Sequence, residues 1–231
     1  MTHTSYLDYK RTFVDAARKV LAGGGSEVLN EAAFPAYANP HPMISFLFWR
    51  RIFKVMRFLE RRGPCQKILD FGTGSGVMLP FLGRMAQQVL AVDVDLSPFQ
   101  KISDYLHFPQ NVTAENIRQK PLASWSANTF DVILALDVLE HVSGLDDTVA
   151  ELGRLLAPTG ILVVSGPTES AFYKLGRRLA GREYSGDYHV RNIYDIRSAL
   201  AKVVEVNTLA TLYYPIPLFK LYLGRKRVGT I

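Results

Sequence analysis

The stretch Ile68-Leu69-Asp70-Phe71-Gly72-Thr73-Gly74-Ser75-Gly76 decides the fold of this 231-residue chain. An apolar run leads directly into glycines at alternate positions, which is typical of a buried strand followed by a tight turn and a helix. Glycine lets the backbone approach a ligand closely, and the N–H groups at a helix start can bind an anionic or hydrogen-bonding group. The stretch therefore predicts a ligand-binding turn.

The spacing of these glycines separates two classes of cofactor site. Residues 72, 74 and 76 give the pattern G-x-G-x-G, whereas the dinucleotide pattern G-x-G-x-x-G requires a glycine at position 77, where the chain has Val77. The sequence thus disfavours a nicotinamide cofactor.

Downstream of this stretch, short β-rich runs alternate with helical segments, a pattern that predicts a parallel sheet with helices on both faces. We expect strands at Lys67–Phe71, Gln88–Asp93, Asn111–Glu115, Phe130–Leu136 and Gly160–Gly166, with edge strands at Val203–Leu212 and Leu218–Leu223. The predicted fold is α/β, with a doubly wound, mostly parallel seven-stranded sheet.

Two helical segments, Tyr6–Ala22 and Met43–Arg62, precede the first strand and are predicted to form an N-terminal helical cap over residues 1–62. Residues 63–231 then form the core, including a lid-like insertion at about 167–191. In the core, Ser143 is the expected cap of a helix that carries Leu145, Val149, Leu152 and Leu156 and ends at Pro158 and Gly160. Asn192 is the expected cap of another helix, with Asp195 in its first turn.

An acidic residue ends the second predicted strand. Asp93 follows Val89-Leu90-Ala91-Val92, seventeen residues after Gly76, where a carboxylate can accept both hydroxyls of a ribose bound at the switch point of the sheet. Asp95 is the competing choice. A glycine turn that only connects two elements remains the plain alternative to a ligand site.

At this point the chain resembles the class I methyltransferases, from about Lys67 to Pro167. Their landmarks match Leu69–Gly76, Ala91-Val92-Asp93, Phe130–Val142, and Leu155-Leu156-Ala157-Pro158-Thr159-Gly160. Thr159 replaces the first glycine of a frequent Pro-Gly-Gly turn, and the stretch Glu115–Leu122 aligns loosely. Four landmarks in the right order make the match specific, and it extends locally to the ubiquinone-pathway O-methyltransferases.

The resemblance implies S-adenosylmethionine as the cofactor. The Gly72–Gly76 loop would hold its methionine part, Asp93 its ribose, and the end of the third strand at Glu115-Asn116 would face the adenine. The predicted cofactor-binding residues are Asp70, Gly72, Thr73, Gly74, Gly76, Asp93, Val94, Glu115, Asn116 and Leu136.

Candidate catalytic residues lie just beyond the fourth strand. Asp137, Glu140 and His141 have the spacing i, i+3, i+4, which puts all three on one side if that turn is helical. A similar grouping in the ubiquinone-pathway enzymes is associated with a divalent cation. We weigh three interpretations: Glu140 and His141 orient the loop and cap the next helix, His141 is a catalytic base, or the group binds a metal. We assign Asp137 and His141 as catalytic candidates and no residue as a metal ligand.

A third catalytic candidate, His189, lies in the segment Arg182-Glu183-Tyr184-Ser185-Gly186-Asp187-Tyr188-His189, which follows the fifth strand. Loops at the carboxyl ends of parallel strands bind acceptor substrates, and this one combines aromatics, a histidine and a glycine. We interpret it as a lid or, equally, as a surface connection whose tyrosines pack on the core.

Composition limits the location and the partners. A single cysteine, the absence of a signal-like N-terminus and the absence of a long uncharged apolar window predict a cytoplasmic protein, with peripheral membrane contact as an open alternative. The net charge of +6 is concentrated at 50–62, 177–182 and 220–227. With no RNA-binding motif present, nucleic acid is not expected as a partner. Aromatic and basic residues in Phe46–Phe58 and Tyr213–Tyr222 suit either the core or a cover over an apolar, membrane-borne acceptor.

The function predicted from the sequence is methyl transfer from S-adenosylmethionine to a small or lipid-like acceptor, at oxygen. The methyl group on a sulfonium is already activated, so transfer needs mainly an aligned nucleophile and exclusion of water. The alternative is a non-catalytic protein that keeps the cofactor pocket and acts as a binding or scaffolding module. Only the enzyme would produce S-adenosylhomocysteine in the presence of an acceptor.

Overall fold

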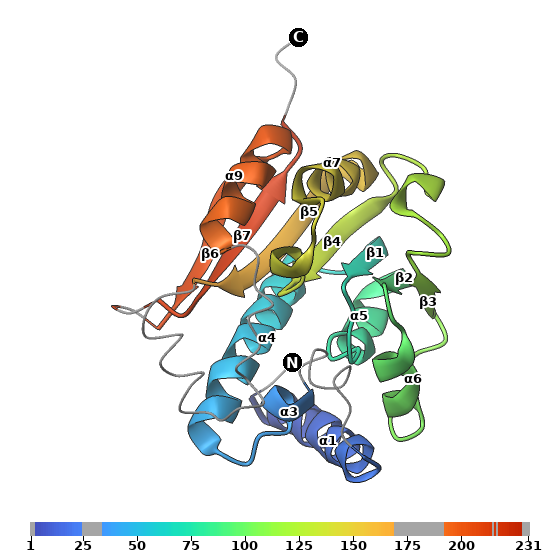
Figure 1. The fold of residues 1–231 in the computed structure, drawn as a ribbon, viewed down its shortest axis with the longest axis vertical. Helices are drawn as coiled ribbons and strands as arrows, with labels where there is room; N and C mark the ends of the chain where they lie inside the picture. The colour runs from blue at the N-terminus through green and yellow to red at the C-terminus, as the bar shows by residue number, and fades with distance from the viewer. Residues whose placement is uncertain (1–2, 25–33, 169–191, 214, 216, 228–231) are drawn as a thin grey trace. The chain divides into compact units, whose positions relative to one another are not determined.

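The computed structural model describes residues 3–24, 34–168, 192–213, 215 and 217–227 (Figure 1). Seven strands form one sheet in the order β3-β2-β1-β4-β5-β7-β6, which confirms the predicted α/β fold with a mostly parallel seven-stranded sheet. The chain divides into two compact units, one made of residues 1–65 and 73–116 and the other of residues 66–72 and 117–231. Each unit is described by itself.

The first unit contains the N-terminal helices, two strands and two short helices. Its elements are α1 (His3–Ala22), α3 (Phe34–Tyr37), α4 (Pro42–Arg62), α5 (Leu79–Met85), β2 (Ala86–Asp93), α6 (Ser97–Ser103) and β3 (Val112–Asn116). β2 and β3 are parallel, with Val89 opposite Val112 and Asp93 opposite Asn116. Both predicted N-terminal helices are therefore present.

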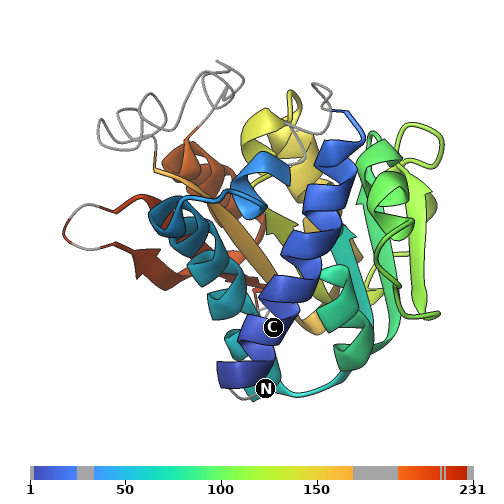
Figure 2. The same cartoon turned by 90° about the horizontal axis from the view of Figure 1, so that it is seen from below.

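Aromatic side chains hold α1, α3 and α4 together. Trp49 is 1% exposed and makes edge contacts with Phe13 and Tyr37, at ring-centroid distances of 5.9 and 5.7 Å. Its indole N–H also donates to the Tyr37 carbonyl at 3.2 Å. Figures 1 and 2 show α1 and α4 side by side. Aromatic pairs in such geometry add to the free energy gained by burial, so Trp49 is a core residue of this unit.

The ends of α4 follow from its sequence. Pro42 stands at the first helical turn, where its missing N–H removes no helical hydrogen bond. At the other end, Gly63 has φ 90°, and its N–H bonds to the carbonyls of Leu59 and Glu60. Glycine is suited to this position because a side chain would strain the backbone there.

The second unit contains the remaining strands. Its elements are β1 (Cys65–Phe71, of which Cys65 belongs to the first unit), η1 (Leu122–Ser124), β4 (Phe130–Leu136), η2 (Leu139–His141), α7 (Leu145–Leu155), β5 (Leu156–Pro167), α9 (Ile193–Val203), β6 (Glu205–Leu212) and β7 (Phe219–Arg225). β1, β4 and β5 are parallel, and β7 runs antiparallel to both β5 and β6.

The C-terminal aromatic segment is a core strand of this unit. Phe219 and Tyr222 are 3% and 1% exposed, and β7 is paired on both sides, which makes it an inner strand instead of the predicted edge strand. The alternative in which Tyr213–Tyr222 forms an exposed apolar cover was therefore wrong for the residues of β7.

The N-caps of α7 and α9, the two α-helices described in this unit, can be compared with the predicted ones. Asn192 forms a reciprocal capping box with Asp195 at the start of α9, which confirms that prediction. The helix α7 is present as predicted, but its predicted cap and end were wrong: Gly144 is its N-cap, with no side-chain hydrogen bond, and the helix ends at Leu155. Two acids in the first turn, Asp146 and Asp147, face the positive end of the helix dipole instead.

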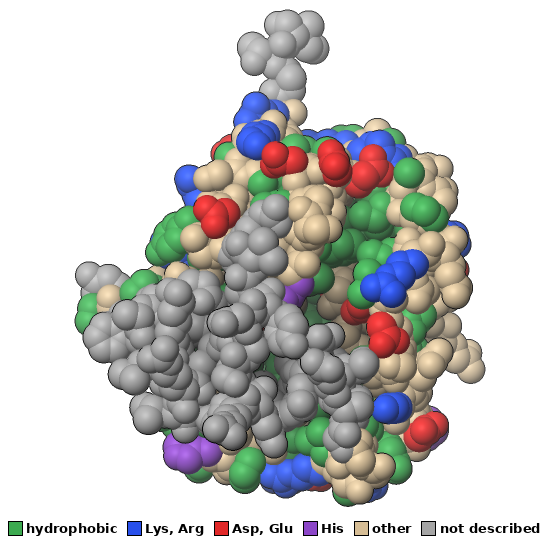
Figure 3. All heavy atoms as spheres, viewed as in Figure 1, with side chains coloured by type: hydrophobic (Ala, Val, Ile, Leu, Met, Phe, Trp, Pro, Cys, Tyr) green, Lys and Arg blue, Asp and Glu red, His purple; other side chains and the backbone are tan. Residues whose placement is uncertain are grey.

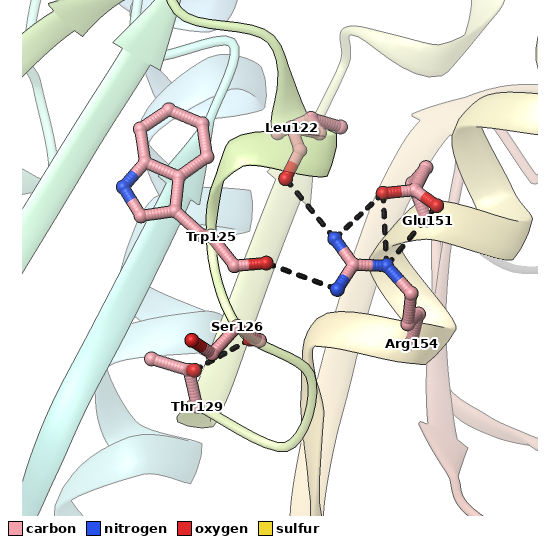
Figure 4. A network of polar contacts seen from close by, with 6 residues as sticks. All are labelled: Leu122, Trp125, Ser126, Thr129, Glu151 and Arg154. Carbon is pink, nitrogen blue, oxygen red and sulfur yellow. Dashed lines mark hydrogen bonds and ion pairs between the residues drawn. The ribbon is translucent and has the colours of Figure 1, made fainter.

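A network of hydrogen bonds centred on Arg154 joins α7 to the loop before β4. The guanidinium of Arg154 donates to the carbonyls of Trp125 (2.9 Å) and Leu122 (3.1 Å) and pairs with Glu151 at 2.8 Å (Figure 4). The planar guanidinium of Arg154 thus donates to two loop carbonyls and to one carboxylate.

In the part of the chain that the structure describes, no helix is long and apolar enough to cross a bilayer.

Candidate functional site

The glycine turn that follows β1 has the backbone that its sequence predicts. Gly72, Gly74 and Gly76 have φ values of 76°, 52° and 70°, a region that favours glycine. Within the first unit, the Thr73 N–H bonds to the Val92 carbonyl at 3.2 Å, and the Gly76 N–H bonds to the Thr73 carbonyl at 2.8 Å. The turn is therefore anchored to β2.

Packing restricts two of these glycines further. A Cβ on Gly72 would lie 2.3 to 3.0 Å from the side chain of Val138, in the second unit. A Cβ on Gly76 would meet Leu79, Phe99 and Phe108 at 3.1 to 3.3 Å, in the first unit. Residue 72 must thus be glycine for steric as well as conformational reasons, and Val138 is a site neighbour that the sequence did not reveal.

Asp93 joins the end of β2 to the glycine turn. Its Oδ2 accepts from the Gly74 N–H at 2.8 Å, and its Oδ1 accepts from the Val94 N–H at 2.7 Å. Burial raises the pKa of this carboxyl, hydrogen bonds from the backbone N–H groups of Gly74, Asp95 and Val94 oppose that rise, and the negative charge of Asp95 adds to it. A carboxylate has about four lone-pair positions, so Asp93 retains capacity for a further donor.

Asp95 faces a different group. Its two oxygens accept from the N–H and the hydroxyl of Ser97, at 2.8 and 3.1 Å, which ties it to the first residue of α6. Of the two acids considered for ribose binding, the geometry next to the glycine turn favours Asp93.

The end of β3 lies beside Asp93. Asn116 is paired with Asp93 across the ladder, and its amide donates to the Val94 carbonyl at 3.0 Å. Glu115 precedes it, opposite Val92, and both residues are partly buried. The first unit therefore brings together Thr73, Gly74, Gly76, Asp93, Val94, Glu115 and Asn116 from the predicted cofactor-binding set.

The second unit carries the other predicted cofactor residues: Asp70, Gly72 and Leu136. Asp70 is 5% exposed and lies opposite Leu134 in the β1–β4 pair, next to the strand ends. Leu136 ends β4 opposite Ser165. The chain passes from this group to that of the first unit across the Gly72–Thr73 peptide bond.

Asp137 begins the connection after β4 in an uncommon conformation. Its φ is 52°, its N–H bonds to the Ser165 carbonyl at 3.0 Å, and its Oδ1 accepts from the Ser165 hydroxyl at 3.2 Å. A non-glycine residue with this φ is worth attention because it stores strain. Ser165 was missed, although a polar residue directly after the apolar run 161–164 was a usable signal.

The grouping of Asp137, Glu140 and His141 does not form one helical face. The turn is a single 3₁₀ turn, Leu139–His141, and Asp137 precedes it in left-handed backbone. Glu140 is 1% exposed, whereas His141 is exposed. The helical condition for a shared face is not met, and His141 lies in solvent while Glu140 lies in the core.

His189 and the lid-like segment lie outside the described residues, so their prediction stays open. Among the described residues, no group of three or more His, Cys, Asp or Glu side chains is arranged to hold a metal ion. The first unit offers backbone N–H groups and the strand-end carboxylate of Asp93, which can bind a ligand that carries hydroxyls and other polar groups. The second unit carries the exposed His141 after β4, a side chain that can accept a proton.

Comparison with known proteins gives a family match. Residues 45–205 match the family model described as a methyltransferase domain. Ubiquinone biosynthesis O-methyltransferase of Mesorhizobium japonicum is 31% identical over 121 residues, covering 51% of this chain and 47% of that protein. The enzyme of the same name from Nitrosococcus oceani is 31% identical over 132 residues, covering 54% of this chain and 56% of that protein. The chain thus spans about half the length of these relatives.

A solved structure gives a match over nearly the entire chain. The N-methyltransferase NodS of Bradyrhizobium japonicum, in complex with S-adenosyl-L-homocysteine, has a TM-score of 0.60 at 16% identity, covering 93% of this chain and 98% of that one. At this identity the likeness concerns the fold.

Proposed function

Because this chain belongs to the methyltransferase-domain family, we propose that it transfers the methyl group of S-adenosylmethionine to an oxygen atom of a small, lipid-like acceptor. The observation that carries the proposal is the hydrogen bond between Asp93 and the Gly74 N–H. It couples a strand-end carboxylate to the glycine turn, which are the two features that a ligand with a ribose and a charged amino-acid part requires.

The residues present fit this cofactor. The turn has glycine at three positions of positive φ, and we assign the methionine part to Gly72–Gly76. Asp93 would accept the ribose hydroxyls, with Val94, Glu115 and Asn116 on the adenine side. Asp70, Thr73 and Leu136 complete the proposed set.

When bound, the cofactor supplies an activated methyl group on a sulfonium. The protein then has to orient the acceptor oxygen, exclude water and take up the hydroxyl proton. His141 is the proposed base because it is exposed on the turn after β4 and can reach an acceptor from outside the core. Asp137, fixed by two contacts to Ser165, is the proposed positioning residue for that turn. His189 remains a second catalytic candidate.

The names of the relatives support an oxygen atom as the methylated group and a lipid-like molecule as the acceptor. They cover half of this chain or slightly more, so the acceptor class belongs to the proposal. The alternative, a cofactor-binding module without catalysis, also requires the glycine turn and Asp93. It does not require His141.

One experiment separates the two. The purified chain is incubated with methyl-labelled S-adenosylmethionine and a hydroxylated aromatic compound that carries an apolar chain, and products are separated by mass spectrometry. Methyl transfer to the hydroxyl oxygen, with one S-adenosylhomocysteine per methylated product, supports the enzyme. Cofactor binding without turnover on hydroxylated aromatics of differing chain length supports the binding module.

A further inference from the structure

The helix α4 has two sharply different faces. Its buried face includes Ser45, Trp49, Ile52, Val55, Met56 and Leu59. Its exposed face follows the intervals 3, 4, 4, 3 and 4 along the chain, which keep residues on one side of a helix. This face, the α4 stripe, consists of Met43, Phe46, Arg50, Lys54, Arg57 and Arg61.

The α4 stripe is cationic along most of its length and apolar at its N-terminal end. Met43 and Phe46 are 61% and 53% exposed, although both are large hydrophobic residues. The guanidinium of Arg50 lies over the Phe46 ring at 5.6 Å, which joins the apolar end to the first cation. At 1.5 Å per residue, the stripe extends over about 27 Å.

Acidic residues are rare on this helix. Glu60 is the single acid among the 21 residues of α4; its carboxylate accepts from the Tyr6 hydroxyl of α1 and is attracted to Arg57, which lies over the Tyr6 ring at 5.2 Å. The surface of α7 and α9 is a useful contrast, because Lys202 pairs with Asp146 at 2.9 Å and Arg154 with Glu151 at 2.8 Å. Figure 3 shows acidic and basic side chains next to one another over these two helices. Of the six residues of the α4 stripe, four are cationic and none is acidic.

We propose that the α4 stripe binds the anionic surface of a lipid bilayer, with the helix axis parallel to the membrane plane. Met43 and Phe46 enter the boundary between headgroups and acyl chains, and the cations meet anionic headgroups. Long Lys and Arg stems can lie along apolar surface while their charges remain among the headgroups. The proposal goes beyond the proposed function and does not depend on it.

Two other partners fit the stripe less well. A polynucleotide would pair with the cations but would leave the exposed Met43 chain in water. A second copy of this chain, bound through the same face, would bring two cationic stripes together, because an isologous contact joins identical patches. A bilayer with anionic lipids satisfies both the charge and the apolar end.

One arginine of this helix is excluded from the stripe. Arg51 is 2% exposed, lies over the Phe48 ring at 5.6 Å and donates to the Tyr37 hydroxyl at 3.4 Å. Replacing Arg51 would disturb the core of the first unit, so a loss of membrane binding in such a variant could not be assigned to surface charge. The test therefore uses Arg61 in its place.

The test is sedimentation of the full chain with phosphatidylcholine vesicles, with and without phosphatidylglycerol, at low and at high salt. The charge variant is R50Q/K54Q/R57Q/R61Q, and its matched control K67Q/K101Q/R197Q/R225Q removes the same net charge from exposed positions elsewhere. The apolar variant is M43S/F46S, and its control Y105S/Y194S removes two exposed aromatics from other helices or their ends. Thermal unfolding checks that each variant is folded.

We expect the unmodified chain to bind only the anionic vesicles and to dissociate at high salt. Each stripe cation removed should weaken binding by roughly fivefold, and M43S/F46S should weaken it even at low salt, while both controls bind as the unmodified chain does. The proposal is overturned if the chain ignores anionic vesicles, or if a control weakens binding as much as its stripe variant. It is also overturned if the stripe residues govern binding to a short RNA or dimer formation in gel filtration while vesicles remain unbound.

Discussion

The carboxylate of Asp93 accepts a hydrogen bond from the backbone N–H of Gly74 at 2.8 Å, across nineteen positions of sequence. The same carboxylate holds the Val94 N–H at 2.7 Å. One side chain thus fixes both the glycine turn and the residue that follows β2. Asp93 therefore has a structural role in addition to the ribose role assigned to it, and the two roles need to be measured separately.

Replacing Asp93 with alanine should weaken S-adenosylmethionine binding by ~1.5–3 kcal/mol, the range for a charged hydrogen-bonding group lost from a site. It should also lower the melting temperature, because the Gly74 N–H loses its acceptor. Asp95→Ala is the matched control, since Asp95 faces Ser97 instead of the turn. Calorimetry and thermal unfolding measure the two effects. Normal cofactor affinity in Asp93→Ala together with reduced affinity in Asp95→Ala would move the ribose role to Asp95.

Cofactor affinity should depend on the protonation of Asp93. Burial, the main cause, raises the pKa of this carboxyl, so it takes up a proton at a higher pH than an ordinary aspartate. Because ribose hydroxyls donate to the charged form, affinity should fall as the pH falls through the raised pKa. Calorimetric titrations at several pH values should show this fall in the unmodified chain and a flatter profile in Asp93→Asn.

The free energy of unfolding should also depend on the protonation of Asp93, but with a pH dependence opposite to that of cofactor affinity. The pKa of Asp93 is higher in the folded state than in the unfolded chain, so the folded state binds the proton more tightly. Its contribution to stability is then fully present below the unfolded pKa and is lost as the pH rises through the folded pKa. Without cofactor, the difference in free energy of unfolding between the unmodified chain and Asp93→Asn should shift against the unmodified chain as the pH rises. A constant difference would contradict the raised pKa.

Gly72→Ala should destabilise the protein more than Gly63→Ala does. Both glycines have positive φ, so each alanine strains the backbone by about 1–3 kcal/mol. The added Cβ at position 63 meets nothing within 4 Å, whereas the one at position 72 lies 2.3 Å from Val138. The excess should be about 1–3 kcal/mol, as in overpacked sites. Denaturant unfolding measures the loss of stability in both variants. Equal losses would show that the Val138 side chain moves aside at no cost in free energy.

His141→Gln should reduce the turnover rate by about 10²–10⁴-fold if His141 is the base, as expected for a lost general acid–base group. Cofactor affinity and melting temperature should stay unchanged, since the side chain is exposed. Ser165→Ala, which removes one contact to Asp137, should reduce turnover less and leave its pH profile unchanged. An unchanged rate in His141→Gln would contradict the role of His141 as the base and leave His189 as the remaining candidate.

Local sequence signals predicted most of the fold. The strand β4 and the Asn192–Asp195 cap were predicted correctly because each depends on neighbouring residues alone. The early end of α7 was missed: Leu156 fits its helical period equally well, but in the structure it pairs with Phe130 and begins β5. The end of α7 therefore depends on the pairing of Leu156 with Phe130, 26 positions away. Helical periodicity carries no information about such a pairing.

The residues of the candidate site likewise include some that the sequence predicted and some that it could not predict. The three glycines and Asp93 were identified from spacing, whereas the hydrogen bond between Gly74 and Asp93 is seen only in the structure. Val138 next to Gly72 and the burial of Arg51 beside Tyr37 could not be predicted, because both depend on side chains from other elements.

The position of β7 affects the order in which the second unit can form during synthesis. β6 leaves the ribosome before β7, yet it joins the sheet only through β7, which lies between it and β5. Until residues 219–225 emerge, β5 keeps an unpaired edge, and β6 has no strand to pair with in its native register. Unpaired edges of this kind invite association between nascent chains. Release of the last strand is thus the event that allows this half of the sheet to close.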